Sequence, residues 1–292
     1  MRRLSIKEDR YLLQLANGQG WEIIAARGAT SWTGRFVSIM QLDACAPNGH
    51  PKLIFMRKRA GMADWHELPP TGWRPHDLTS LQLWYHPDVP DVVCELGTAE
   101  GHEEEIIRMW LALCPVYNRA LEMGGLPLHA ALVAADGKGI LLAAAGGIGK
   151  STCCRRIARP WEVLCDDTAL VVADARGDCS THPFPTWSNY LWKRSELTWD
   201  VQTHVPLSAI FFLEQHTTDE AIPVGQGQAS VLITESATQI CQTGWRNLAP
   251  GDKRLFKQAL FENACALARK IPAFRLRVSK YGRFWEKIEQ AV

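Results

Sequence analysis

The chain has 292 residues, 47% of them hydrophobic, and its 32 basic residues nearly balance 31 acidic ones. This length predicts about two domains with sizeable cores, and the charge balance gives no electrostatic footprint for nucleic acid. No apolar run approaches the ~20 residues of a membrane span, and no apolar segment follows the basic residues near the N-terminus. We therefore expect a cytoplasmic protein that binds neither nucleic acid nor membrane.

Cysteine and histidine usage argues against a zinc site and a disulfide framework. The nine cysteines are odd in number and form no C-x-x-C pair. Cys153 and Cys154 fall in a predicted helix, where we expect them to fill core space. The first hundred residues contain four histidines at uneven spacing, for which surface or structural roles are expected.

Residues 1–100 predict a strand-rich first domain. Short apolar segments alternate with turn-forming pairs such as Asn17-Gly18 and Asn48-Gly49, a pattern typical of strands joined by tight turns. The expected strands are residues 12–15, 21–24, 36–40, 53–56, 81–85 and 92–96.

A helix is expected to follow and to lead into a second domain, residues 101–292. The acidic run Glu103-Glu104-Glu105 suits a helix N-terminus. Pro115 is expected to kink or restart the helix, and Gly124-Gly125 to end it.

The second domain is expected to begin with a hairpin. Residues 128–133 predict a buried strand, and Asp136-Gly137 is a hairpin turn signal. The chain then returns along the apolar run at residues 140–143 into a small-residue loop, residues 144–149. Lys150-Ser151-Thr152 opens a predicted helix.

This order of strand, loop and helix is typical of a phosphate-binding P-loop. Glycines let backbone N–H groups turn towards phosphate oxygens, and the helix N-terminus adds about half a positive charge. The lysine of such a loop reaches the β- and γ-phosphates, and the following hydroxyl ligates Mg²⁺. These two residues are Lys150 and Ser151 here. The expected nucleotide-binding residues are Ala145, Gly146, Gly147, Ile148, Gly149, Lys150, Ser151 and Thr152.

One position departs from the P-loop pattern G-x-x-x-x-G-K-[ST], because Ala144 stands where the first glycine is expected. Alanine has the next smallest side chain, so the loop closes if the backbone φ angle at residue 144 is negative. The alternative interpretation is a glycine-rich turn that precedes a core helix without binding anything.

Further elements follow in an α/β pattern. Pro160 is expected to stop the helix, and a strand at 161–165 ends at Asp166-Asp167. In open α/β sheets that edge is where ligands bind. The remaining expectations are a hairpin from residue 169 that turns at 176–178, an irregular aromatic-rich stretch at 183–199, strands at 207–213 and 274–278, and helices at 228–243, 252–269 and 284–291.

Two carboxylates and one histidine join Lys150 as the candidate catalytic groups. Paired carboxylates beside a triphosphate can divide two tasks, holding Mg²⁺ and accepting the proton of an attacking hydroxyl. Asp166 and Asp167 lie sixteen residues or more after Lys150, and which of them is the base stays open. His129 is expected near the phosphates because its strand pairs with the P-loop strand, although an isolated histidine is more often a core residue. The candidate catalytic residues are therefore Asp166, Asp167, His129 and Lys150, with Ser151 and Asp166 as metal ligands.

The segments LHAALV, AAAGGIGKS and VLCDD together resemble the catalytic domain of HPr kinase/phosphorylase. The resemblance is closest to lasso-peptide precursor kinases and SynChlorMet cassette proteins, shorter relatives from peptide-modification gene clusters. Likeness to the latter extends to GGLPLHAAL, AIFFLEQ and FWEKIE, and so covers roughly residues 105–292. The resemblance implies a P-loop catalytic domain with a mixed sheet in the α/β class, ATP and Mg²⁺ as ligands, and Asp167 and His129 at the positions of two family residues.

The same resemblance shapes the functional hypotheses. Ala144 and Ala145 replace a Gly and an Asp of HPr kinase, and its downstream glutamate and phosphorylase signature have no counterpart that we locate. We therefore expect a Mg-ATP-dependent kinase for a Ser or Thr hydroxyl on a ribosomally made peptide or small protein, rather than on HPr. The alternatives are a nucleotide-gated, non-catalytic partner in a peptide-maturation complex and, third, a phosphatase or phosphorylase. A homo-oligomer is compatible with the sequence.

The aromatic-rich residues 185–194 are a candidate acceptor cleft. They mix rigid aromatic side chains with two cations and lack a clear period, as a loop that contacts a peptide would. Trp187 and Lys193 are the expected substrate contacts. A loop that caps the core, with its tryptophans simply packed, is the alternative.

Overall fold

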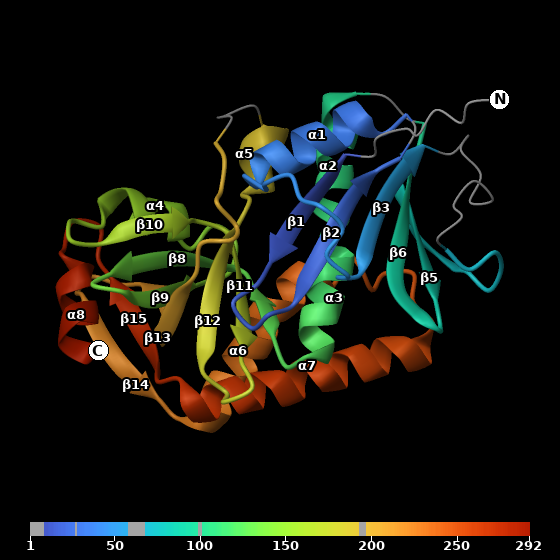
Figure 1. Cartoon of the computed structure of the whole chain (residues 1–292). Helices are drawn as coiled ribbons and strands as arrows, with labels where there is room; N and C mark the ends of the chain where they lie inside the picture. The colour runs from blue at the N-terminus through green and yellow to red at the C-terminus, as the bar shows by residue number, and fades with distance from the viewer. Residues whose placement is uncertain (1–8, 27, 58–67, 99–100, 193–196) are drawn as a thin grey trace, which may run out of the picture. The chain divides into compact units, whose positions relative to one another are not determined.

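The structure is a computed structural model that describes residues 9–26, 28–57, 68–98, 101–192 and 197–292 (Figure 1). The chain divides into two compact units. The N-terminal unit takes in the described parts of Met1–Gln14, Gly18–Pro115 and Trp187–Thr198. The C-terminal unit comprises Leu15–Asn17, Val116–Thr186 and Trp199–Val292.

The N-terminal unit is built on a six-stranded mixed sheet in the order β1-β2-β3-β6-β5-β4. Strands β2, β3 and β6 run parallel, and the remaining pairs are antiparallel. The strands are β1 (Arg10–Gln14), β2 (Gly20–Ala25), β3 (Lys52–Arg57), β4 (Arg74–Leu78), β5 (Leu81–His86) and β6 (Val89–Leu96). Five of the expected strands are therefore present. β4 was not expected, because its mostly exposed polar sequence and Pro75 lack a strand-like apolar pattern.

The strand expected at residues 36–40 is wrong, because these residues belong to helix α1 (Thr30–Ile39). Over the longer window, Trp32, Phe36 and Ile39 recur at the three- and four-residue spacing of a helix and are buried. The rings of Trp32 and Phe36 stack at 5.3 Å. A five-residue apolar window does not separate a buried helix segment from a strand.

Helices α2 (His102–Leu111) and α3 (Cys114–Glu122) occupy the segment where one kinked or restarted helix was expected. Pro115 lies in the first turn of α3, where its missing N–H costs no helical hydrogen bond. Gly124 has φ 83°, a left-handed conformation that suits the residue following a helix. The helix break at Pro115 and the stop before Gly124-Gly125 are confirmed.

The C-terminal unit is built on a larger, nine-stranded mixed sheet. Its path runs β10-β8-β9-β13-β12-β11-β7, and β15 pairs with both β13 and β14. The strands are β7 (Leu126–Leu128), β8 (Ala130–Ala135), β9 (Lys138–Ala143), β10 (Glu162–Cys165), β11 (Thr168–Ala173), β12 (Cys179–Phe184), β13 (Val205–Gln215), β14 (Glu220–Val224) and β15 (Ala273–Val278).

Strand register brings several strand ends to one edge of this sheet. β8 is antiparallel to β9 with Ala130 opposite Ala143, so the chain just before β8 lies beside the carboxyl end of β9. β10 is antiparallel to β8 and ends opposite Leu132. β13 and β15 run parallel to β9, so their carboxyl ends lie at the same edge. Residues 129, 144 and 166 therefore lie along one border.

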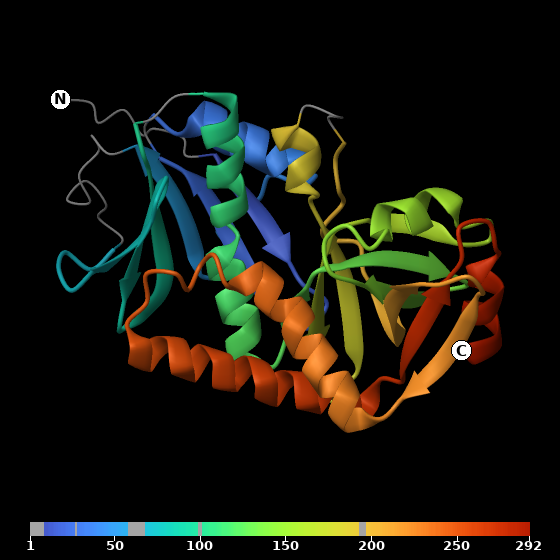
Figure 2. The same ribbon diagram turned by 180° about the vertical axis from the view of Figure 1, so that it is seen from behind.

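Helices cover this sheet through a continuous apolar core. Helix α4 (Lys150–Arg156) packs against β8, and α8 (Phe284–Ala291) packs against β14 and β15. Cys153 and Phe284 join alternate residues of β8, β9, β13 and β15 in one buried cluster. Helices α6 (Gln226–Cys241) and α7 (Pro250–Lys270) pack against each other (Figure 2). The long helices α6 and α7, the short helix α8 and the strands β13 and β15 agree with the sequence expectations.

The strand expected at residues 128–133 is instead two strands that break at His129. β7 pairs with β11, whereas β8 pairs with β9 and β10, so the chain changes strand neighbours at this residue. Helix α6 supplies the hydrogen-bond partners of the backbone at this break. The His129 N–H donates to the Ser236 carbonyl, and the Ser236 hydroxyl donates to the His129 carbonyl.

Residues 183–199 are more regular than expected. Strand β12 extends to Phe184, and helix α5 spans Trp187–Leu191. Among the helices that the structure describes, none has both the length and the apolar character needed to cross a membrane.

Candidate functional site

The loop between β9 and α4, residues 144–149 and here called the glycine loop, has the backbone conformation that its sequence requires. Gly147 and Gly149 have φ angles of 82° and 119°, which residues other than glycine rarely adopt. Ala144 is not among the described non-glycine residues with positive φ, so the condition for an alanine at this position is met. A Cβ atom added at Gly146, Gly147 or Gly149 would meet no atom within 4 Å. One side of the loop is therefore open.

Lys150 is buried behind this loop, with 7% of its surface exposed. Its ammonium group donates to the Ala144 carbonyl at 2.9 Å and lies 2.9 Å from Nε2 of His129. Burial lowers the pKa of Lys150, and the nearby carboxylates of Asp167 and Asp166 oppose that effect. An anion bound at the loop would likewise favour the charged ammonium group.

The ring of His129 connects Lys150 to two further side chains. Its Nδ1 lies 2.6 Å from Oε1 of Gln239, a residue of α6, and its Nε2 lies 3.1 Å from Oδ1 of Asp167. The Gln239 amide nitrogen faces the Glu235 carbonyl at 3.5 Å. The amide oxygen of Gln239 is therefore the atom that faces His129. A neutral ring therefore carries its proton on Nδ1 and donates it to Gln239.

With that tautomer, Nε2 can serve only one of its two neighbours at a time. In the neutral ring, Nε2 is an acceptor and takes a hydrogen bond from Lys150. In the charged ring, Nε2 is a donor and binds the Asp167 carboxylate. Protonation of His129 thus decides whether the Asp167 carboxylate is held or left available.

The two aspartates have different partners. Asp166 accepts a 2.6 Å hydrogen bond from the hydroxyl of Thr186, whereas Asp167 faces His129. Both follow β10 at the sheet edge, as expected, and both are half-buried. The Asp167 side chain is 34% exposed, so an incoming group can reach it.

The remaining expected nucleotide ligands lie on or beside the glycine loop. Ala145 is exposed, and its carbonyl accepts the Ile148 N–H at 3.4 Å. Ser151 is half-buried in the first turn of α4, and Thr152 is exposed beside Arg155. Within the described residues no group of three or more His, Cys, Asp or Glu side chains is arranged to hold a metal. A metal at Ser151 and Asp166 stays a prediction.

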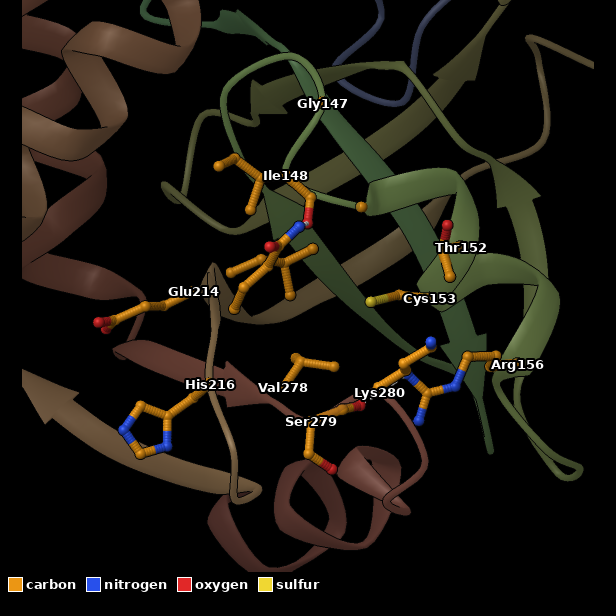
Figure 3. Close-up of a pocket in the computed structure, with 13 residues that line it drawn as sticks. Gly147, Ile148, Thr152, Cys153, Arg156, Glu214, His216, Val278, Ser279 and Lys280 are labelled. Carbon is orange, nitrogen blue, oxygen red and sulfur yellow. Dashed lines mark hydrogen bonds between the residues drawn. The ribbon is translucent and has the colours of Figure 1, made fainter.

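A cavity of about 370 Å³ opens beside the glycine loop. Figure 3 shows Ile148 on one side and Val278 and Ser279 on the other, with Cys153 directed between them. The lining comes from the loop, α4, the end of β13 and the segment after β15. These residues are Gly147, Ile148, Gly149, Thr152, Cys153, Arg156, Leu213, Glu214, Gln215, His216, Val278, Ser279 and Lys280.

The expected acceptor contacts fall in the N-terminal unit or outside the description. Trp187 begins α5, is 6% exposed and stacks on Phe36 with ring centroids 6.2 Å apart. Its burial favours the core-capping alternative, and a role in acceptor binding stays a prediction. Lys193 lies outside the described residues.

Several site residues carried no sequence signal. Gln239 lies 110 residues after His129 on a helix recognised only by its apolar pattern. Thr186 stood in a stretch expected to be irregular. Gln215 donates to the Ile148 carbonyl at 3.0 Å and so ties the loop to β13. The AIFFLEQ segment was recognised as a strand, which located Gln215 without indicating its contact.

Comparisons with known proteins bear on this site as a whole. A search of curated proteins found no match to the chain. The family model described as SynChlorMet cassette protein ScmC matches residues 92–292. The matched span takes in His129, the glycine loop, both aspartates and the cavity lining, and it is well over half of the chain. The chain therefore belongs to the ScmC family of SynChlorMet cassette proteins.

Proposed function

We propose that this protein is a Mg-ATP-dependent kinase with an HPr-kinase-like catalytic domain, which phosphorylates a Ser or Thr hydroxyl of a peptide or small protein. The observation that carries the proposal is the cluster at the mouth of the glycine loop. There Lys150 lies 2.9 Å from His129, and His129 lies 3.1 Å from Asp167. A buried cation beside an accessible carboxylate suits phosphoryl transfer, which depends mainly on positioning and electrostatics.

The glycine loop supplies the phosphate contacts in this proposal. On its open side, the backbone N–H groups of Gly147 to Ser151 are the proposed donors to phosphate oxygens, and the Ile148 N–H would exchange its 3.4 Å bond to the Ala145 carbonyl for a phosphate oxygen. The Lys150 ammonium group is already directed along the loop by the Ala144 carbonyl. Charge-assisted contacts of this kind are about twice as strong as neutral hydrogen bonds.

Asp167 is the proposed general base. As the acceptor oxygen forms its bond to the γ-phosphorus, the bond to the β–γ bridging oxygen breaks and ADP leaves. The hydroxyl proton passes to the Asp167 carboxylate. This role needs the carboxylate free of a donor, which is the state that goes with the neutral His129 ring bound by Lys150.

Asp166 and Ser151 are the proposed magnesium ligands. A carboxylate and a hydroxyl are the oxygen donors that Mg²⁺ prefers, with water and phosphate oxygens for the rest of its shell. When bound, Mg²⁺ would neutralise charge that develops on the β- and γ-phosphate oxygens. The Thr186 hydroxyl fixes Asp166 through one oxygen and leaves the other for a ligand.

The peptide or small-protein acceptor rests on the resemblance to peptide-directed kinases and on membership of the cassette family. No described residue identifies it. The competing function is that of a nucleotide-gated partner that binds ATP without transferring phosphate. The position of Asp167 beside the glycine loop favours catalysis over binding alone.

Mass spectrometry of Ser- and Thr-containing peptides incubated with the protein and Mg-ATP tests this proposal. We expect addition of one phosphoryl group. Asp167→Asn should lower turnover by about 10²- to 10⁴-fold, the usual contribution of general-base catalysis, while ATP still binds. Asp166→Asn should raise the Mg²⁺ concentration needed for half-maximal rate. Asp178→Asn, at an exposed turn aspartate, is the matched control.

One outcome would refute the proposed base, and another would refute the kinase assignment. Phosphorylation at the wild-type rate by Asp167→Asn would show that Asp167 is not the general base. ATP binding with no transfer to any peptide, together with an effect of ATP on binding of a peptide, would favour the non-catalytic partner.

A further inference from the structure

The cavity beside the glycine loop is separate from the residues that carry the proposed chemistry. His129 precedes β8 and Asp167 follows β10, and both strands lie on one side of β9 in the sheet order. The cavity is lined from the ends of β13 and β15, which lie on the other side of β9. The glycine loop, which follows β9, stands between the two regions.

This topology fixes the direction in which an elongated ligand would lie. A polyphosphate held by the loop has the His129–Asp167 side at one end and the cavity at the other. In parallel α/β sheets, ligands bind outside the carboxyl ends of the strands, which is where β13 and β15 place the cavity. Its volume of about 370 Å³ is within the ordinary range for small-molecule sites, roughly 300–1,000 Å³.

The cavity also has the surface of a nucleoside site. Ile148, Leu213 and Val278 present apolar surface for a planar base. Ser279 and Lys280 add polar groups to the lining, and Lys280 lies beside Arg156 (Figure 3). Glu214 is directed away from the centre in the same view, and its carboxylate is 3.4 Å from Arg275. The lining therefore combines apolar side chains with the two cations of Arg156 and Lys280.

The outer wall is held in place by internal contacts. The Arg156 guanidinium donates to the carbonyls of Ser279 and Gly282 at 2.9 and 2.5 Å. The Ser279 N–H donates to Asp219 at 2.6 Å. On the facing side, Gln215 bonds the Ile148 carbonyl. Hydrogen bonds therefore hold both walls in position, and the cavity is preformed and does not depend on closure of a loop.

We propose that this cavity binds the base and ribose of the nucleoside triphosphate whose phosphates occupy the glycine loop. The assignment rests on the proposed function. It makes Val278 and Ile148 contacts of the nucleoside and leaves the far side of the loop to the acceptor hydroxyl.

Calorimetric titration of the full chain with Mg-ATP and with Mg-tripolyphosphate tests the assignment. Tripolyphosphate carries the phosphates without the nucleoside, so we expect at least tenfold tighter binding of Mg-ATP. Val278→Phe should fill the cavity and abolish that preference while tripolyphosphate binds as before. Val231→Phe, at an exposed valine of α6, is the matched control and should keep the preference.

A second variant tests the same assignment even if Val278→Phe fails to fold. Ile148 is 36% exposed, and Ile148→Ser keeps its backbone N–H, so ATP binding should weaken several-fold with tripolyphosphate unaffected. Equal affinities of the wild type for both ligands, or an undiminished ATP preference in both variants, would overturn the cavity assignment alone. Failure of both ligands to bind would overturn the proposed function as well.

Discussion

Gln239 should control catalysis without touching a reacting atom, because it sets the tautomer of His129. Replacing it by Leu removes the acceptor that Nδ1 has at 2.6 Å. The imidazole side chain is only 16% exposed, so water replaces that acceptor poorly. The ring can avoid an unsatisfied donor by moving its proton to Nε2. There it would donate to Asp167 and deprive Lys150 of its acceptor.

The size of the effect follows from this hydrogen bond. A buried donor left without a partner costs about 1–3 kcal/mol, which corresponds to roughly five- to 150-fold in rate. We expect Gln239→Leu to lower kcat by that factor and to change the KM for ATP little, since the glycine loop is untouched. Gln242→Leu, at an exposed glutamine following the same helix, should have wild-type kinetics.

A conservative variant separates positioning from folding. Gln239→Glu keeps an acceptor at Nδ1, so the Nδ1 proton stays in place and Nε2 can still accept from Lys150. Its kcat should therefore lie well above that of Gln239→Leu. Steady-state kinetics of both variants, with thermal melts of each, measure this. Wild-type kcat in Gln239→Leu, or an equally low kcat in both variants with unchanged melting temperatures, would refute the reasoning.

Further predictions concern other groups. Lys150→Met should abolish Mg-ATP binding in calorimetry while changing the melting temperature little, because loss of the ammonium contacts is offset by relief of its burial; retained binding would contradict this. Burial lowers the pKa of His182 to about 4 from its ordinary 6.5, so its contribution is complete above pH 6.5 and is lost as the pH falls. Urea unfolding should show about 2 kcal/mol less stability at pH 5 than at pH 7 from this group, and His182→Gln should remove that part of the slope. Trp187→Ala should cost about 3–5 kcal/mol in unfolding experiments, whereas Trp192→Ala, at a residue 62% exposed, should stay within about 0.5 kcal/mol. Equal effects of the two would contradict the packing assignment for Trp187.

The parts of the site that sequence predicts well are those set by local chemistry. Gly147 and Gly149 adopt left-handed φ angles, and Lys150 begins a helix after an apolar strand, as the loop pattern requires. Asp166 and Asp167 follow from the strand that precedes them. Each of these features depends on residues within a few positions of one another.

The parts that sequence misses depend on partners far along the chain. The break at His129 arises because its neighbours pair with different strands, which no local pattern indicates. Gln239 and Thr186 reach the site from elements placed by tertiary packing. Residues 36–40 were misjudged for a different reason, because a five-residue apolar window that starts at Phe36 fits a strand as well as a helix. The burial of Trp32 on the same face as Phe36 shows that the segment is a helix.

The backbone of His129 depends on a helix, where an ordinary strand residue would depend on a neighbouring strand. Its N–H is bonded to Ser236 at 3.3 Å and its carbonyl accepts from the same residue. The amide of residue 129 is therefore protected from solvent only while α6 is docked. In hydrogen–deuterium exchange it should exchange with local undocking of α6, faster than the amides of β9, which open only with the whole sheet. Any ligand or partner that clamps α6 would then slow exchange at residue 129 and hold its ring in register with Asp167.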